Sequence, residues 1–373
     1  MERAGAFEDL PPGSEKFVIA GARGLVAEHV LRGLASLGKQ PALLVDNDPR
    51  MDGRHIDGIE VVSPEEAIRL YPDAVYVAAI YTHTPLRLQL RALGARRVAS
   101  YAQLFHRYPE AFLPFFAVAD PESIHASCQE IQAASAIWAD DQSTALYSAL
   151  IEWFTKLVSE SVPRPLPMDE MYFPPFLALR DDEVFADCGA YDGDTAREYC
   201  RVADGRYREI LSLEPDPVAF DKLTSLGIAR MRPIRSAVGA NVGSVAFCSA
   251  GEMGSHTVAT GASGVPVSGE ILAVPVMRLD DLSPAPTFVK MDIEGAEMEA
   301  LEGGRQLLLH GETAWAVALY HRQEDFWRIP LFIHECNPEL RLYLRHYAED
   351  WAETVCYAIP ADRVRASGIT RGA

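Results

Sequence analysis

Short apolar runs alternate with helical patterns in the first 120 residues. Apolar runs bounded by polar or glycine-rich turns indicate buried strands, and apolar positions three or four residues apart indicate helices. The predicted strands are 17–20, 42–45 and 74–80, and the predicted helices are 26–37, 64–70 and 86–93. Strands that alternate with helices predict a parallel sheet.

The same alternation returns in the second half of the chain. Here the predicted strands are 184–187, 210–214 and 233–238, and the predicted helices are 195–200 and 217–226. Residues 242–248 are expected to form one arm of a hairpin. The Gly- and Ser-rich stretch 251–269 then predicts a long loop of the kind that covers a site.

Between the two halves, residues 121–158 have a helical pattern, and several prolines follow it. A chain of 373 residues exceeds the usual size of one hydrophobic core. We therefore predict an α/β protein with two Rossmann-like domains. Residues 1–120 form the first domain, residues 121–168 a helical connector, and residues 169–373 the second domain.

The charge of the chain bears on its partners. Residues 1–120 carry 13 Lys and Arg against 15 Asp and Glu, whereas the remaining residues carry 21 against 38, which gives a net charge of −19. Such an anionic chain repels phosphate backbones and acidic lipids, so we predict no nucleic-acid or membrane partner. The sequence gives no prediction of oligomeric state.

The six cysteines form no metal-binding or disulfide pattern, which is typical of a reduced compartment. The first ten residues are acidic, and no run of about eighteen apolar residues occurs. We therefore expect a cytoplasmic protein that is neither exported nor membrane-spanning.

The string from Asp187 to Thr195 closes a predicted strand and opens a helix, with glycines at 189 and 193. Glycines at such a turn let a cofactor approach the backbone closely. The acidic side chains of this string disfavour a diphosphate and tolerate a cationic sulfonium, which favours S-adenosylmethionine over NAD. Glu214 ends the next strand, where a carboxylate can accept hydrogen bonds from ribose hydroxyls.

A third string runs from Lys290 to Glu297 after the apolar residues 287–289, and a predicted helix follows it to Leu309. Alternation along a strand would place Lys290, Asp292 and Glu294 on one face. Ionisable groups gathered at a strand end are costly unless they are paired or functional. A structural ion pair between Lys290 and Asp292 is the alternative interpretation.

Together these strings resemble the FkbM-type methyltransferase family. The resemblance rests on segments 187–195, 213–215, 279–282 and 290–297, and it extends to 171–173, 183–185, 320–321, 325–330, 345–347 and 353–354. It implies a class I methyltransferase fold for residues 169–373, with S-adenosylmethionine as methyl donor. It also implies a hydroxyl acceptor on a sugar, a glycan or a natural-product-like small molecule.

The resemblance also implies roles for individual residues. The cofactor contacts it implies are Asp187, Gly189, Ala190, Tyr191, Gly193, Asp194 and Thr195 on the methionine side, Glu214 at the ribose, Ala237 and Val238 at the adenine, and Asp292 near the methyl group. The catalytic residues it implies on the acceptor side are Lys290, Asp292, Glu294 and His321.

Transfer of a methyl group to oxygen requires a base that removes the hydroxyl proton. Asp292 and His321 are the two candidates, and we expect His321 to titrate near neutrality. Asp292, Glu294 and His321 could also hold a divalent cation, although no closed ligand set is evident and a metal is not predicted.

The turn Gly21–Gly24, with Asp46 after the second strand, resembles an abbreviated nucleotide- or nucleotide-sugar-binding fold. Arg23 stands where a dinucleotide-binding turn has its middle glycine, so we predict that this domain does not bind NAD tightly. An NAD(P)-linked oxidoreductase and a catalytically silent nucleotide-sugar-binding scaffold are the alternative functions.

Overall fold

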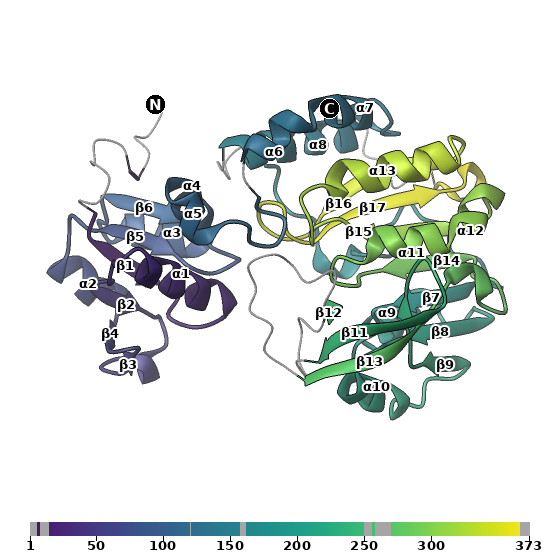
Figure 1. Ribbon diagram of the computed structural model, residues 1–373, viewed down its shortest axis with the longest axis horizontal. Coiled ribbons are helices and arrows are strands. Elements are labelled where there is room, and N and C mark those ends of the chain that lie inside the picture. Colours follow the sequence, from purple (N-terminus) through teal and green to yellow (C-terminus); the bar gives the residue numbers. More distant parts are fainter. Residues whose placement is uncertain are drawn as a thin grey trace. The chain divides into compact units, whose positions relative to one another are not determined.

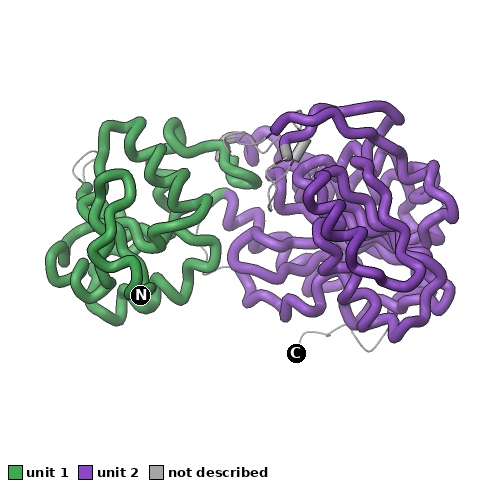
Figure 2. Tube along the Cα trace, turned by 90° about the horizontal axis from the view of Figure 1, so that it is seen from below, with its two compact units in different colours: residues 1–120, 155–159 green, residues 121–154, 160–373 purple. Residues whose placement is uncertain are grey.

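The computed structural model describes residues 6–7, 15–119, 121–156, 162–249, 256–257 and 270–365. The chain forms two compact units (Figure 2). Unit 1 comprises Met1–Asp120 with Thr155–Ser159, and unit 2 comprises Pro121–Phe154 with Glu160–Ala373. The predicted loop 251–269 lies outside the described residues, apart from 256–257.

Unit 1 contains a six-stranded sheet in the order β3-β4-β2-β1-β5-β6 (Figure 1). Its strands are β1 (Phe17–Ala20), β2 (Leu43–Val45), β3 (His55–Ile56), β4 (Ile59–Val62), β5 (Val75–Ala78) and β6 (Arg97–Ser100). Its helices are α1 (Leu25–Ser36), α2 (Pro64–Leu70), α3 (Thr84–Ala92), α4 (Tyr101–Arg107) and α5 (Pro109–Phe112), with the 3-10 turn η1 (Pro49–Met51).

The core of unit 1 follows from its apolar runs. Every residue of β1 and β5 is buried, as expected for parallel strands covered on both faces. Strand β1 pairs in parallel with β2 and with β5. The predicted parallel α/β domain is confirmed, with predicted and observed elements differing by at most three residues at their ends.

Unit 2 contains a seven-stranded sheet in the order β16-β17-β15-β14-β7-β8-β9, in which β17 is antiparallel to both of its neighbours. The strands of this sheet are β7 (Val184–Cys188), β8 (Glu209–Leu213), β9 (Met231–Ile234), β14 (Phe288–Met291), β15 (Ala314–Ala318), β16 (Arg341–His346) and β17 (Thr354–Ile359). A second sheet contains β10 (Ala237–Val238), β11 (Gly243–Ser249), β12 (His256–Thr257) and β13 (Glu270–Met277).

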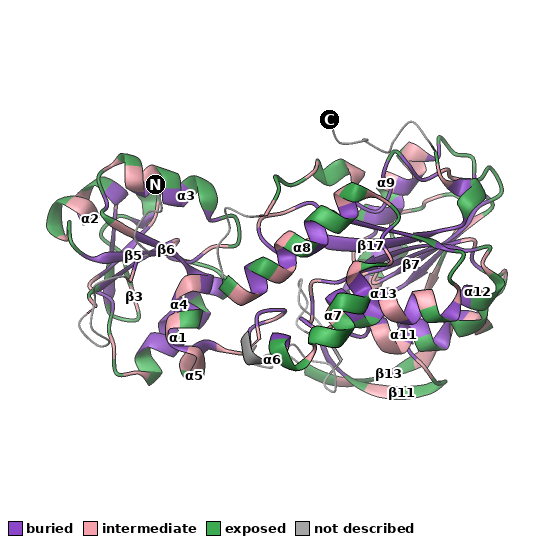
Figure 3. Ribbon diagram, turned by 90° about the horizontal axis from the view of Figure 1, so that it is seen from above, coloured by how far each residue is buried: buried purple, intermediate pink, exposed green. Residues whose placement is uncertain are grey.

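The helices of the second half surround the larger sheet. They are α6 (Pro121–Ala126), α7 (Cys128–Ser135), α8 (Asp141–Lys156), α9 (Asp194–Val202), α10 (Pro217–Thr224), α11 (Glu297–Gly303), α12 (Arg305–His310) and α13 (Asp325–Cys336), with the 3-10 turns η3 (Met168–Glu170), η4 (Leu279–Asp281) and η5 (Ala361–Arg363). In Figure 3 the central strands β7 and β17 are buried, whereas much of β11 and β13 is not. None of the described helices combines the length and the apolar character that crossing a membrane requires.

Residues 121–168, predicted as a helical connector, contain the helices α6, α7 and α8. Phe154 of α8 packs edge-on against Phe326 of α13, with ring centroids 4.9 Å apart. Asp140, just before α8, forms an ion pair of 2.6 Å with Arg345 of β16. These contacts attach the helices to unit 2, and the predicted domain boundaries stay predictions.

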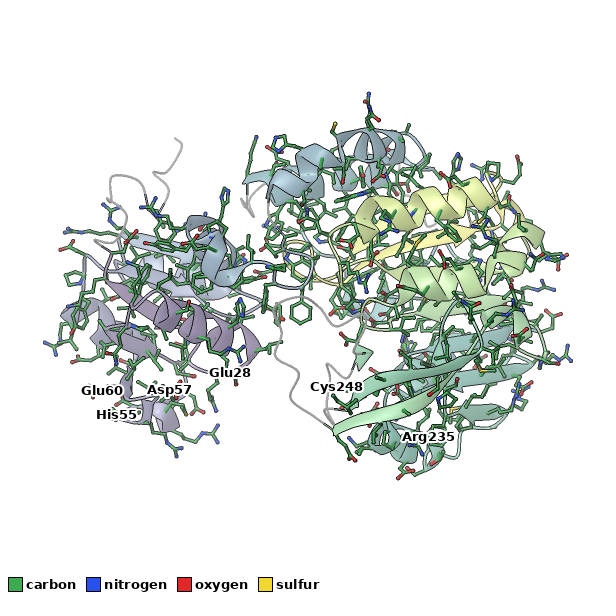
Figure 4. All side chains as sticks on the ribbon, in the orientation of Figure 1. Glu28, His55, Asp57, Glu60, Arg235 and Cys248 are labelled. Carbon is green, nitrogen blue, oxygen red and sulfur yellow. The ribbon has the colours of Figure 1, made fainter. Side chains whose placement is uncertain are left out.

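Two predicted elements are wrong in detail. The strand expected at 233–238 is interrupted, because β9 belongs to the large sheet and β10 to the small one, with Arg235 at the break (Figure 4). The hydroxyl of Ser236, the next residue, donates to the carbonyls of Ala237 and Pro275, which turns the chain toward β13. The helix expected to run from 297 to 309 is split at Gly304 into α11 and α12.

Candidate active site

A buried ion pair connects two neighbouring strands near the centre of the large sheet. Lys290 of β14 and Asp187 of β7 lie side by side in the parallel register, with Nζ 3.2 Å from Oδ1, and both side chains are almost fully buried. Burial alone would lower the pKa of Lys290, but the carboxylates of Asp187 and Asp292 outweigh it and raise the pKa. Burial raises the pKa of Asp187 to about 6, against the opposing effect of Lys290. Both groups are therefore charged at neutral pH.

The same ammonium group holds the glycine turn after β7. Lys290 Nζ donates to the carbonyl of Gly189 at 2.8 Å and to that of Cys188 at 3.3 Å. Gly189 has φ +76°, and a Cβ there would lie 1.9 Å from the backbone oxygen of Asp292. The turn is thus packed against the exit of β14 so closely that only glycine fits.

Glu214 follows β8 and connects this turn to the next strand. Its two carboxylate oxygens accept from the backbone N–H groups of Tyr191 and Asp216, each at 2.8 Å. Burial raises the pKa of Glu214 to about 7, although the two N–H donors oppose the shift. Each oxygen keeps a further lone pair with which it could accept a hydroxyl donor.

The other predicted cofactor residues lie around this turn or further along the chain. Ala190 is buried, and Gly193, with φ +80°, precedes α9, which begins at Asp194 and Thr195. The carboxylate of Asp194 accepts from the N–H of Thr195. Ala237 and Val238 are buried in the small sheet, where they pair with Val276 and Met277. Their adenine role stays a prediction.

The exit of β14 differs from the expected strand. The strand ends at Met291, so alternation along it does not place Asp292 and Glu294. They lie in a tight turn, where Glu294 has φ +57° and Gly295 has φ +91°. Both carboxylates nevertheless face His321, because the turn directs them there: His321 Nε2 lies 3.3 Å from Asp292 Oδ1 and 3.7 Å from Glu294 Oε2.

The carboxylate of Asp292 accepts hydrogen bonds from two tyrosine side chains. Tyr172 donates its phenolic O–H to Oδ2 at 2.7 Å, and Tyr320 donates to Oδ1 at 3.0 Å. Burial would raise the pKa of Asp292, but Lys290, His321 and the two phenols together lower it. Asp292 is therefore an ionised group, and it still exposes 24% of its side chain.

His321 does not titrate where the sequence led us to expect. Its side chain is buried, which alone would lower its pKa, but the carboxylates of Glu297, Glu294 and Asp292 raise it to about 10. The expectation of a titration near neutrality is therefore wrong for the ligand-free protein. His321 is an imidazolium there, and Asp292 is the better-placed proton acceptor of the two candidates.

Three groups of this cluster had no role assigned from the sequence. Glu297, fully buried at the start of α11, accepts from His321 Nδ1 at 2.8 Å and from the N–H of Ile293 at 2.9 Å. Burial and the charge of Asp292 raise the pKa of Glu353 to about 7. Tyr172 contacts Asp292 across 120 residues of sequence. All three occur within or beside the strings that resemble the family, but no spacing rule marks them.

Three residues of the cluster could hold a divalent cation. One ligand atom each from Asp292, Glu297 and His321 lie within 4.8 Å of one another. The sequence suggested Glu294 instead of Glu297. The geometry therefore permits a metal, and the metal requirement stays open to experiment.

The close approach at Gly189 predicts a specific loss of stability. Gly189→Ala should destabilise unit 2 by about 2 kcal/mol or more beyond the cost of a left-handed alanine, because backbone oxygen cannot move aside. Gly227→Ala is the matched control, since Gly227 also has positive φ (+64°) but no atom within 4 Å of its added Cβ. Urea unfolding measures both, and equal losses would contradict the packing argument.

The raised pKa of His321 predicts a pH dependence of stability. A raised folded-state pKa means that its stabilisation is complete below about pH 6.5 and is lost as the pH rises toward 10. Between pH 7 and 10 the free energy of unfolding should therefore fall more steeply in the native protein than in His321→Gln. His310→Gln, at the exposed end of α12, should keep the native slope. Parallel slopes for the native protein and His321→Gln would refute the assignment.

Comparisons with known proteins agree with this geometry. Residues 187–348 match the model of the methyltransferase FkbM domain. The crystal structure of methyltransferase FkbM from Methylobacillus flagellatus KT is similar over 95% of this chain and 91% of its own, with 22% identity and a TM-score of 0.76. A search of curated proteins found no match.

A second solved structure is less similar than the FkbM structure. A precorrin-6y C5,15-methyltransferase from Geobacter metallireducens GS-15 has 17% identity and a TM-score of 0.30, with 50% of this chain and 84% of its own covered. At that score it carries no argument. The similarity to the FkbM structure shows the fold of a methyltransferase, and the domain match favours the methyltransferase prediction over the oxidoreductase alternative.

The glycine turn after β7 and the carboxylate after β8 both lie within the residues that match this domain. Residues 187–348 of this chain are therefore similar to the methyltransferase FkbM domain, in a unit with the fold of a methyltransferase.

Proposed function

We propose that this enzyme transfers the methyl group of S-adenosylmethionine to a hydroxyl oxygen of a small molecule or glycan of the sugar or natural-product type. The observation that carries the proposal is the position of the Asp292 carboxylate, which accepts hydrogen bonds from two phenols. These phenols fix it at the carboxyl end of β14, next to the turn that Lys290 holds. A fixed anionic acceptor is what a hydroxyl nucleophile requires.

The residues around the glycine turn fit S-adenosylmethionine. Because Gly189 has no side chain, the backbone of the turn lies directly against Asp292. The carboxylate of Glu214 has lone pairs that can accept hydrogen bonds from the two ribose hydroxyls. When bound, the cofactor supplies a methyl group on a positively charged sulfur. The carboxylates of Asp187, Asp194 and Asp292 make the electrostatic environment favourable for that positive charge.

Asp292 orients the acceptor and takes its proton. A hydroxyl that donates to Asp292 directs an oxygen lone pair away from the carboxylate. As the oxygen gains the methyl group, its proton becomes strongly acidic, so even a carboxylate of lowered pKa can accept it. Tyr172 and Tyr320 hold Asp292 in position through both of its oxygens.

The exposed side of the cluster favours a polyhydroxylated acceptor. Asp292 exposes 24% of its side chain and Glu294 33%, whereas Lys290 and His321 are buried behind them. Carboxylates accept hydrogen bonds from hydroxyls of a sugar ring or a polyol. An acidic rim also disfavours phosphorylated or carboxylated groups next to the reacting hydroxyl.

Removing the carboxylate of Glu214 should weaken donor binding. Glu214→Ala should lower the affinity for S-adenosylhomocysteine by about 1–3 kcal/mol, the scale of lost hydrogen bonds to a charged group. Because the pKa of Glu214 is raised to about 7, native affinity should also fall between pH 8 and 6, and this pH dependence should disappear in Glu214→Gln.

Isothermal calorimetry measures both effects. Glu302→Ala, on the exposed side of α11, is the control and should bind with native affinity. If Glu214→Ala binds with native affinity, the carboxylate of Glu214 does not contribute to donor binding.

The proposed transfer is tested with methyl-labelled donor and a panel of sugars, glycosides and polyols. Mass spectrometry should locate the label in an ether linkage to oxygen, and label on nitrogen, carbon or sulfur would refute the proposal. With the acceptor so found, Asp292→Asn should lower turnover about a hundredfold or more, since the base is lost.

In Asp292→Asn, binding of S-adenosylhomocysteine should persist, because Asp292 acts on the acceptor proton. Asp281→Asn, an exposed partner of Arg278, should retain native turnover. Full turnover in Asp292→Asn would show that another group takes the proton.

A further inference from the structure

The lining residues of one pocket all belong to unit 1. The pocket has a volume of about 570 Å³ and opens at the carboxyl ends of β1, β2 and β5. The chain order reverses here, because β2 lies on one side of β1 and β5 on the other. A crevice at such a reversal is where open parallel sheets bind their ligands.

The turn after β1 forms one wall of this pocket. Gly21 has φ +88°, and a Cβ there would lie 2.4 Å from Cγ2 of Ile80, so the turn packs directly on the exit of β5. Gly24 has φ +98° and precedes the twelve-residue helix α1 without a side-chain cap. This wall therefore presents backbone rather than side chains to the cavity.

Asp46 supplies an acceptor of hydroxyl hydrogen bonds. It directly follows β2 and lines the pocket, with 15% of its side chain exposed. Its Oδ1 accepts from the backbone N–H of Asp48 at 2.9 Å, and its Oδ2 lies 3.5 Å from Nε of Arg23. A carboxylate at the end of this strand is well placed to accept from the two hydroxyls of a ribose.

Arg23 supplies a cation on the same wall. Its guanidinium is 56% exposed and only loosely paired, at 3.5 Å from Asp46 and 3.4 Å from Asp48. Asp48 already has a shorter ion pair, of 2.9 Å, with Arg50. Arg23 can therefore turn toward a phosphate, whose oxygens match the guanidinium in a bidentate contact.

Other lining residues of the pocket suit a flat ring. Ile80 and Leu86 give the pocket an apolar surface, and the amides of Asn47 and Gln89 exchange hydrogen bonds of 2.9 Å in both directions beside it. Amide groups offer both donors and acceptors to the polar edge of a base.

We propose that unit 1 binds a ribonucleotide with a terminal 5′-phosphate, separately from the methyl-transfer site. Asp46 accepts from the ribose hydroxyls, Arg23 contacts the phosphate, and the base lies over Ile80 and Leu86. A side chain at position 23 disfavours the bridging diphosphate of NAD, which needs close approach of the backbone. This site does not rest on the proposed acceptor, so either proposal can fail alone.

The test uses full-length protein with saturating S-adenosylhomocysteine, which fills the adenosine site of the methyltransferase domain. Calorimetric titrations with UMP, AMP, UDP, ADP and NAD should show saturable binding of one or more of the four mononucleotides and weaker binding of NAD. Comparison of the uridine and adenosine series identifies the base. The matching 2′,3′-dideoxynucleotide should bind at least about tenfold more weakly, since it lacks both hydroxyls.

Two variants test the protein side of the same contacts. Asp46→Asn keeps an oxygen for the Asp48 N–H but loses the carboxylate, and Arg23→Ala loses the cation, so each should weaken binding about tenfold or more. Asp73→Asn and Arg96→Ala are the matched controls, because they alter an exposed ion pair in the same unit. They should bind like the native protein.

The proposal is overturned if no mononucleotide binds saturably at millimolar concentration. It is equally overturned if the nucleotide affinity changes neither with the two substitutions nor with removal of the ribose hydroxyls. The dideoxynucleotide comparison needs no substitution, so it decides the matter even if a variant fails to fold.

Discussion

The buried contact between the Lys290 ammonium and the Asp187 carboxylate is the constraint on which the candidate active site depends. One ammonium group bridges the ends of β14 and β7 and also holds the carbonyls of the glycine turn. A buried charge that loses its partner costs about 3–5 kcal/mol, so neither residue can be removed alone. The pair thus fixes the distance between the glycine turn and Asp292, two residues after Lys290.

The groups around Asp292 determine the position and the charge of its carboxylate. Tyr172, Tyr320 and His321 contact the carboxylate and favour its ionised form. Tyr172 lies far in sequence from the adjacent residues Tyr320 and His321. Glu297 in turn orients the imidazole from behind. The strained backbone at Tyr172 (φ +68°) and Glu294 (φ +57°) is part of the same arrangement, as is common where a site imposes its geometry on the chain.

The sequence predicted what depends on local pattern. The parallel sheets follow from alternating apolar runs, and the glycine turn and Glu214 follow from residues at strand ends, which the structure brings together by a direct hydrogen bond. The strand at 233–238 was mispredicted because β9 and β10 pair with different partners, which is a long-range property. The pKa of His321 was also beyond local pattern, since it depends on carboxylates that only the folded chain assembles.

A crystal structure with S-adenosylhomocysteine tests the central claim most directly. The account predicts that the ribose hydroxyls contact Glu214 and that the open side of the sulfur faces Asp292. Between them there should be room for an acceptor oxygen at about 3 Å from the position of the methyl carbon. A sulfur that faces away from Asp292, or a ribose bound elsewhere than at Glu214, would contradict the account.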